Sequence, residues 1–325
     1  MIITKNKNIE TGDKMIITKP LKIKGICIQN RIVMPPMDRA SSKDGSVSDE
    51  LIEYYRQRSE STGLVIIEHE YVSPEGKAHP KQLSMASDDF IESYKKLTDA
   101  IHNESTFTIA QISHAGKEAK VENPLNLNTM SLDDIDHIRE SFIKAAKRSK
   151  KSGFDGVEIH CAHGYLLNQF YSPYTNKRTD DYGGSLENRL RLTNEIIQEI
   201  RDALGEDYII AVRFGAYDYL DGGSKLEEIP YAVKSFVDSG VDLIDISGGL
   251  CRYSNPQSKD PGYFKELSKI AKDSCDVPII LTGGVKKLND AEELLKRGYA
   301  DLIGIGRAML MDAKWSKKAM EKVNE

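Results

Sequence analysis

A regular alternation of short apolar runs with longer stretches of helical periodicity most constrains the fold of this chain. The runs are rich in Val, Ile and Leu, and they predict strands at residues 31–34, 64–70, 106–113, 156–160, 208–214, 243–247, 277–282 and 302–305. Strands that are apolar throughout must be covered on both faces, as in a parallel sheet whose strands are joined by helices. Repeated units of about 35 residues predict a single-domain α/β fold, the TIM (β/α)8 barrel. An open doubly wound sheet is the alternative.

Two of the intervening stretches carry signals for helix boundaries. Ser131 is predicted to cap a helix whose apolar positions step by three or four residues and which Gly153 closes. A second helix is predicted from Asn289 to Gly298, with Glu292 as a capping-box partner.

The N-terminus contains a short repeat, because the pentapeptide at residues 1–5 recurs at residues 15–19. We interpret residues 1–18 as a loose polar extension and residues 19–325 as the barrel, and Met15 is an alternative start of the chain.

Charge and composition exclude several classes of protein. The chain has 45 Lys and Arg against 50 Asp and Glu, a net charge of −5, which argues against electrostatic binding of nucleic acid. No apolar window approaches the length of a membrane span, and the first residues are too polar for a signal peptide, so the expected location is the cytoplasm. Four cysteines without a C-x-x-C pair indicate reduced thiols, with no zinc ribbon, iron–sulfur cluster or disulfide scaffold.

Glycine-rich turns follow the last two predicted strands. Gly283 and Gly284 lie after the seventh strand, and Gly304, Gly306 and Arg307 lie after the eighth, where barrels commonly bind phosphate. Backbone N–H groups approach an anion closely where no Cβ intervenes. No G-x-G-x-x-G motif follows an early strand, which argues against a Rossmann sheet.

Polar side chains gather at the predicted carboxyl ends of the strands, where barrel enzymes place their active sites. His160 and His163 flank Cys161, which is compatible with a metal site and also with two hydrogen-bond donors that hold one oxygen. We favour the donors and expect no metal, because no second Cys/His pair completes a ligand set. Tyr165 is a candidate proton donor. The sequence has no G-x-S-x-G elbow of a serine hydrolase.

Residues 160–189, HCAHGYLLNQFYSPYTNKRTDDYGGSLENR, strongly resemble the old yellow enzyme family of FMN-dependent NAD(P)H:flavin oxidoreductases and ene-reductases. Residues 30–37, 111–116 and 305–307 resemble the same family in register, so the resemblance covers nearly the whole barrel. It implies bound FMN, with NADH or NADPH as the hydride donor.

The resemblance also implies a role for each matching residue. Amide edges such as that of Gln111 suit the pyrimidine end of the flavin ring, and a permanent charge on Arg213 would stabilise the anionic reduced ring. Four residues would hold the FMN phosphate, namely Gly283, Gly284, Gly306 and Arg307. The complete cofactor set adds Pro35, Pro36, Met37, Asp38, His69 and Gly249.

The substrate that the resemblance implies is a small activated alkene. His160 and His163 would bind its carbonyl or nitro oxygen while hydride arrives from the flavin, and Tyr165 would protonate the α-carbon. Ala40 takes the position of a tyrosine that faces the substrate in some members, which indicates a roomier pocket.

Other departures from the family pattern concern the flavin and the ends of the chain. Asp38 replaces a Cys or Thr, and we expect it to shift the flavin potential. His69 replaces a small residue, and the stretch between Gly116 and Met130 is shorter than usual, which indicates a reduced lid. The sequence lacks the iron–sulfur segment of larger relatives, so electrons are expected directly from a soluble nicotinamide.

Three other functions stay open. The chain is alternatively an FMN-dependent dehydrogenase or demethylase of the same family, or a flavin-binding protein with little turnover. From the pattern of residues alone, a phosphate-binding aldolase or isomerase barrel without flavin also fits. Self-association as a homo-oligomer is compatible with such barrels.

Overall fold

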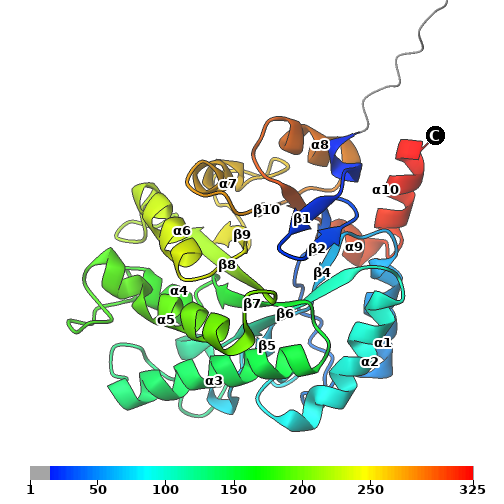
Figure 1. The fold of residues 1–325 in the computed structure, drawn as a ribbon. Coiled ribbons are helices and arrows are strands. Elements are labelled where there is room, and N and C mark those ends of the chain that lie inside the picture. The colour runs from blue at the N-terminus through cyan, green and yellow to red at the C-terminus, as the bar shows by residue number, and fades with distance from the viewer. Residues whose placement is uncertain (1–14, 325) are drawn as a thin grey trace, which may run out of the picture.

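The computed structural model describes residues 15–324 and forms a closed parallel barrel. Its strands are β3 (Ile32–Met34), β4 (Leu64–Ile66), β5 (Glu70–Tyr71), β6 (Phe107–Ser113), β7 (Gly156–Cys161), β8 (Ile209–Tyr217), β9 (Leu243–Gly248), β10 (Ile279–Thr282) and β11 (Leu302–Gly304). Strands β4 and β5 both pair with β6 and occupy one position in the barrel, and β3 pairs with β4 and β11, which closes the ring (Figure 1). The predicted TIM barrel is therefore confirmed, and the open-sheet alternative is wrong.

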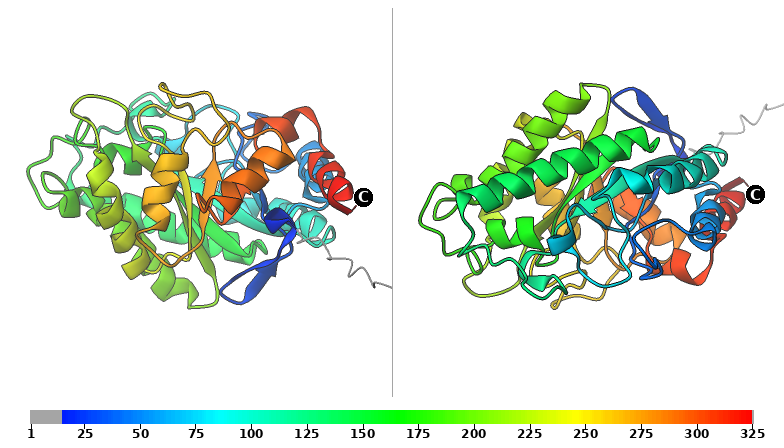
Figure 2. Two further views of the ribbon diagram at one scale, coloured as in Figure 1. Left: turned by 90° about the horizontal axis from the view of Figure 1, so that it is seen from above. Right: turned by 90° about the horizontal axis from the view of Figure 1, so that it is seen from below.

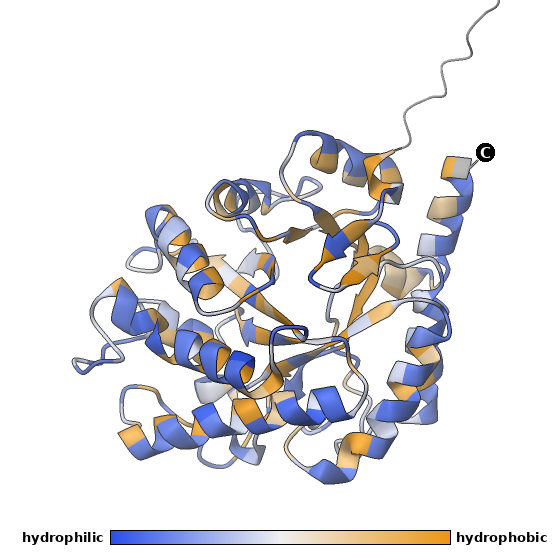
Figure 3. Cartoon of the chain, in the orientation of Figure 1, coloured by the Kyte–Doolittle hydropathy of each residue, from blue (hydrophilic) through white to orange (hydrophobic). Residues whose placement is uncertain are grey.

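Helices surround the strands and turn their apolar sides inward (Figures 1 and 3). They are α1 (Asp49–Ser59), α2 (Ile91–His102), α3 (Leu132–Lys151), α4 (Leu166–Tyr171), α5 (Leu186–Leu204), α6 (Ile229–Asp238), α7 (Lys265–Lys272), α8 (Leu288–Lys296), α9 (Arg307–Met311) and α10 (Trp315–Asn324). The predicted cap of α3 is confirmed, because the Ser131 side chain accepts a hydrogen bond from the Asp134 N–H. No helix among the described residues has both the length and the apolar character to cross a membrane.

The predicted strand at residues 64–70 is interrupted between β4 and β5. The N–H of Glu68 donates to the hydroxyl of Tyr55 on α1 at 2.9 Å, so it does not continue the strand ladder. The break lies directly before His69, which consequently faces the carboxyl end of the barrel.

A β-hairpin that the sequence interpretation missed closes the opposite end of the barrel. Strands β1 (Leu21–Ile23) and β2 (Ile26–Ile28) pair antiparallel around a two-residue turn (Figure 2). Ile23 and Ile28 are buried in a cluster with apolar residues of the barrel strands, among them Val33 and Leu64. The hairpin therefore seals the amino-terminal end with apolar side chains.

The predicted N-terminal extension is only partly described. Residues 1–14 lie outside the described residues, and Ile16–Thr18 form a 3₁₀ turn with Ile17 fully buried. The N–H groups of Ile16 and Ile17 donate to the Glu292 carboxylate at 3.0 and 2.9 Å. The capping box predicted for Asn289 and Glu292 is therefore wrong, since α8 follows Lys287 without a side-chain cap and Glu292 anchors the N-terminal segment instead.

Candidate active site

A cavity of about 490 Å³ opens at the carboxyl ends of the strands. It brings together fourteen of the sixteen predicted site residues, namely Pro35, Pro36, Met37, Asp38, His69, Gln111, His160, His163, Tyr165, Arg213, Gly283, Gly284, Gly306 and Arg307. Residues from all parts of the barrel therefore converge on one site, as expected for strand ends and the loops that follow them.

The two predicted residues that do not line this cavity are Gly249 and Ala40. Gly249 is packed against Asp218, and a Cβ at this position would lie 2.2 Å from the Asp218 Oδ1 atom. Ala40 is exposed, and its N–H donates to Asp38 Oδ1 at 2.8 Å. Gly249 is thus required for close packing, and Ala40 shapes the turn that carries Asp38.

Several lining residues were not in the predicted set. They are Ser247, Arg252, Tyr253, Tyr263, Thr282, Val285, Gly304 and Leu310. Thr282 and Gly304 end β10 and β11, and Ser247 is the last residue but one of β9, so position near a strand end is the signal that identifies them. The long loop between β9 and α7 contributes Arg252, Tyr253 and Tyr263. A loop has no regular sequence pattern from which the positions of its side chains could be predicted.

His160 is a neutral hydrogen-bond donor. The N–H of Ala162 donates to His160 Nδ1 at 3.2 Å, so the proton of the neutral ring lies on Nε2. Burial, and then the neighbouring His163, lower the pKa of His160 well below its usual range. The pKa of His163 is also well below its usual range, because the ring is buried and Arg213 is nearby. The Nε2 atom of His163 lies 2.8 Å from Ser247 Oγ.

Cys161 does not join these two imidazoles. Its Sγ lies 3.9 Å from Thr193 Oγ1 of α5, on the helix side of β7, and burial raises the pKa of the thiol to about 12. A metal site of His160, Cys161 and His163 is therefore not formed, since a protonated thiol that faces away offers no thiolate ligand.

A second group of possible ligands consists of Asp38, His69 and His79, whose ligand atoms lie within 4.8 Å of one another. The neighbouring Gln82 determines what His69 can do. The Gln82 Oε1 atom accepts from the Ala78 N–H at 2.6 Å, which leaves its Nε2 to donate to His69 Nδ1 at 2.8 Å. The His69 proton is consequently on Nε2, which makes this nitrogen a donor towards Asp38 and not a metal ligand.

Asp38 is an ionised carboxylate at the cavity wall. Burial alone would raise its pKa, but the close imidazoles of His69 and His79 lower it below the usual range. The contacts are 3.7 Å to His69 Nε2 and 2.7 Å to His79 Nε2. Behind Asp38, burial raises the pKa of Glu68 to about 8, so Glu68 holds its proton at neutral pH.

Tyr165 lies beside the histidines with its hydroxyl protonated. Its ring centroid is 5.0 Å from that of His160 and 5.4 Å from that of His69. Burial, and then the charge of Asp38, raise the pKa of Tyr165 to about 12. The tyrosine therefore retains a proton that it can donate at neutral pH.

Buried polar groups with unused hydrogen-bonding capacity lie on β7 and on its neighbouring strands β6 and β8, in or behind the wall of the cavity. Arg213 donates to Asp245 at 2.8 Å, and Gln111 Nε2 donates to Glu158 Oε1 at 2.7 Å. Within the described part of the chain, the Nε atom of Arg213 and the Oε2 atom of Glu158 are buried without a partner. Burial also raises the pKa of Glu158 to about 8. Such groups suit a polar ring that presents both donors and acceptors.

The glycine-rich end of the cavity leaves room for an anion. Gly284 has a φ of +72°, which side-chain-bearing residues rarely adopt, and a Cβ on Gly306 would lie 3.0 Å from Met37 Sδ. The Arg307 side chain is exposed at the same end of the cavity. Together with the polar wall, this arrangement fits a ring that carries a phosphate, as FMN does.

His114, at the end of β6, has a structural role. It is buried, its Nδ1 accepts from the Gly116 N–H at 2.9 Å, and a Cβ on Gly76 would lie 2.4 Å from its ring. Burial lowers the pKa of His114 to about 4 from 6.5. Between pH 4 and 6.5, His114 is therefore protonated in the unfolded chain and neutral in the folded protein.

We therefore expect the His114→Asn variant to flatten the pH dependence of stability. In the wild-type protein, the His114 contribution to the free energy of unfolding falls by about 3 kcal/mol as the pH drops from 6.5 to 4. Asparagine can still accept from the Gly116 N–H and does not titrate. Urea unfolding of both proteins between pH 4 and 7 measures the difference, and equal slopes would contradict a neutral, buried His114.

Comparisons with known proteins agree with this geometry. The model of the NADH:flavin oxidoreductase / NADH oxidase family matches residues 17–128 and 124–325. The chain is 36% identical to the NADH oxidase of Thermoanaerobacter brockii, with 92% of this chain and 50% of that protein aligned, so it spans half the length of that relative. It is also 36% identical to the NADPH dehydrogenase of Bacillus subtilis, with 94% of both chains aligned.

A solved structure supports the same relationship. The old yellow enzyme homologue of Zymomonas mobilis superimposes with a TM-score of 0.82 at 26% identity and covers 94% of this chain and 92% of its own. The similarity therefore extends over the barrel as a whole.

Proposed function

Because this chain belongs to the NADH:flavin oxidoreductase / NADH oxidase family, which includes the old yellow enzymes, it is an NAD(P)H-dependent flavin oxidoreductase with FMN as its cofactor, and we propose that it reduces an activated C=C bond. The acceptor class that fits the site is a small enone, enal or nitroalkene. The proposal depends on the functional groups that meet at one wall of the cavity.

FMN would be held by the polar wall and the glycine-rich end of the cavity. Gln111 and Arg213 suit the polar edge of its ring, whereas Gly283, Gly284, Gly306 and Arg307 suit its phosphate. Bound FMN supplies a ring that accepts hydride from NAD(P)H and passes it on.

The observation that carries the proposal is the pairing of a fixed neutral donor with a protonated phenol. His160 directs an Nε2–H group from its buried ring, and Tyr165 keeps its proton, with the ring centroids 5.0 Å apart. An activated alkene requires these two groups, one at its oxygen and one at its α-carbon.

The histidines would stabilise the charge that develops on the substrate oxygen. The His160 Nε2–H donates to this oxygen, and His163 becomes a second donor when its contact with Ser247 gives way. As hydride adds to the β-carbon, the α-carbon gains electron density and Tyr165 donates its proton there. The product gains one hydride and one proton, which completes the reduction of the double bond.

An anaerobic spectral titration tests the proposed function. NAD(P)H is expected to bleach the flavin absorbance of the purified holoenzyme, and addition of 2-cyclohexenone is expected to restore it. Bleaching that no enone reverses would contradict alkene reduction and favour a binding protein. Bleaching by a saturated ketone or an amine would instead favour the dehydrogenase reaction.

A further inference from the structure

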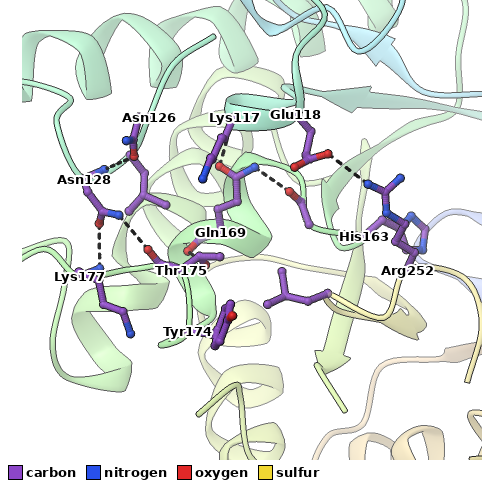
Figure 4. A pocket seen from close by; sticks show the side chains of 13 residues that line it. Lys117, Glu118, Asn126, Asn128, His163, Gln169, Tyr174, Thr175, Lys177 and Arg252 are labelled. Carbon is purple, nitrogen blue, oxygen red and sulfur yellow. Dashed lines mark hydrogen bonds and ion pairs between the residues drawn. The ribbon is translucent and has the colours of Figure 1, made fainter. Parts of the chain in front are cut away.

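A second cavity of about 380 Å³ adjoins the first one. Its walls come from the loop after β6, from α4 with the segment that follows it, and from the loop after β9 (Figure 4). Two residues, His163 and Arg252, line both cavities. A molecule whose oxygen binds at His163 could therefore extend past Arg252 into this second space, which we call the outer pocket.

The outer pocket has an excess of positive charge. Lys117, Lys177 and Arg252 line it, with Glu118 as the acidic lining residue. The chain as a whole carries a net charge of −5, so this local excess opposes the overall charge. A concave surface of one charge sign concentrates ligands of the opposite sign.

Arg252 is held in place weakly. Its Nη2 atom lies 3.1 Å from Glu118 Oε2, and the two side chains are 57% and 39% exposed. Exposed ion pairs of this kind contribute little to stability, because solvent screens them and two long side chains must be held in place. A carboxylate or phosphate on a ligand could thus take the place of Glu118 at little cost, and a bidentate contact with Arg252 would more than compensate for it.

The backbone that carries the two lysines is fixed, whereas their side chains are exposed. Gln169 Oε1 accepts from the Lys117 N–H at 3.3 Å, and Asn128 Oδ1 accepts from the Lys177 N–H at 2.8 Å. In the described residues, the Lys117 ammonium group makes no hydrogen bond or ion pair, and that of Lys177 donates to the Pro173 carbonyl. Tyr174 adds a half-exposed apolar wall beside Lys177 (Figure 4).

Backbone strain marks the junction between the two cavities. His163 and Arg252 have φ angles of +61° and +60°, values that non-glycine residues seldom adopt. Non-glycine residues keep such angles where the surrounding structure over-determines them. Both of these residues line the two cavities at the place where they meet.

We propose that the outer pocket is an anion subsite. It binds a carboxylate or phosphate that is part of the molecule in the inner cavity, with Arg252 as the principal contact and Lys117 and Lys177 as further cations. The inference rests on the proposed function, because it assumes that a substrate occupies the inner cavity. The anion could belong to the electron acceptor or to the nicotinamide dinucleotide, and binding experiments distinguish these sources.

The test compares two saturated cyclic ketones that differ only in a side-chain carboxylate or its methyl ester. Titration calorimetry of the oxidised holoenzyme gives both Kd values without turnover. We expect the carboxylate to bind more tightly than the ester at low salt, and Arg252→Gln to reduce this preference about tenfold, or about 1.4 kcal/mol.

Glu118→Gln should increase the preference for the carboxylate, because it frees Arg252. Lys120→Gln, on the same loop but outside the pocket lining, is the matched control and should leave the preference unchanged.

A parallel titration with NADP⁺ identifies the source of the anion. If Arg252→Gln weakens only NADP⁺, the subsite binds the dinucleotide phosphates, whereas a change confined to the ketone carboxylate assigns it to the acceptor. Equal binding of carboxylate and ester by the wild-type protein, together with unchanged NADP⁺ binding in the variant, would overturn the subsite. Failure of the proposed function is separate, because it appears as a flavin that no enone reoxidises.

Discussion

The Tyr165→Phe variant is expected to slow the reoxidation of the reduced protein by 2-cyclohexenone by about 10²- to 10⁴-fold, the usual contribution of a positioned general acid. Reduction of the same variant by NAD(P)H should stay near the wild-type rate, because that half-reaction requires no proton from Tyr165. The expected result is thus a separation of the two half-reactions.

The structure gives a physical reason for this separation. Burial and the charge of Asp38 raise the pKa of Tyr165 to about 12, so the hydroxyl is protonated throughout the neutral range. Phenylalanine preserves the ring that packs near His160 and His69 and removes only the proton. Solvent would then have to protonate the substrate in a partly buried site.

Stopped-flow absorbance at the flavin band, under anaerobic conditions, measures both rates. Tyr231→Phe provides the control, since Tyr231 is an exposed tyrosine of α6 that lies outside the cavity lining. A similar loss in both half-reactions would reject Tyr165 as the proton donor and would indicate a disturbed cofactor site. An unchanged enone reaction would assign the proton to another group.

The sequence could predict the barrel because each of its strands is a continuous apolar run. Few folds other than a parallel sheet covered by helices can bury such strands on both faces. The same argument placed the polar strand-end residues on one rim, since parallel strands have their carboxyl ends together, and the family resemblance assigned the remaining site residues. The β1–β2 hairpin escaped prediction because each strand has only three residues, which is too short for a periodic signal.

The rest of the site depends on contacts between distant segments. Gln82 sets the tautomer of His69, and His79 reaches Asp38, yet both lie in a loop without regular structure. At Glu292, a local sequence pattern gave a wrong prediction because a distant segment binds the side chain. Its spacing fitted a capping box, but the N-terminal segment competes for its carboxylate and offers two N–H donors, those of Ile16 and the buried Ile17.

Replacement of Asp38, which lines the cavity, should change the flavin potential. We expect Asp38→Asn and Asp38→Thr to raise the midpoint potential of bound FMN. Asp38 lines the cavity and stays ionised because its contacts with His69 and His79 outweigh the effect of burial on its pKa. A negative charge beside a ring that gains electrons opposes its reduction, so removing this charge should favour reduction.

The size of the shift follows from the charge and its screening. In a medium of effective dielectric constant about 20, a unit charge at roughly 4 to 10 Å contributes about 2 to 4 kcal/mol, or about 40 to 90 mV for a two-electron couple. Solvent and the polar groups around Asp38 screen part of this field, so an increase of some tens of mV is expected. Equilibration with reference dyes at pH 7 measures the potential, and Asp44→Asn, an exposed acid of the same loop, is the control.

The sign of the change separates two roles of the carboxylate. An unchanged potential would mean that Asp38 does not act on the ring. A decrease would mean that Asp38 acts mainly by holding neighbouring side chains in place. In that case His79→Asn, which also breaks the contact between Asp38 and His79, should lower the potential too, whereas an increase in Asp38→Asn assigns the effect to the carboxylate charge.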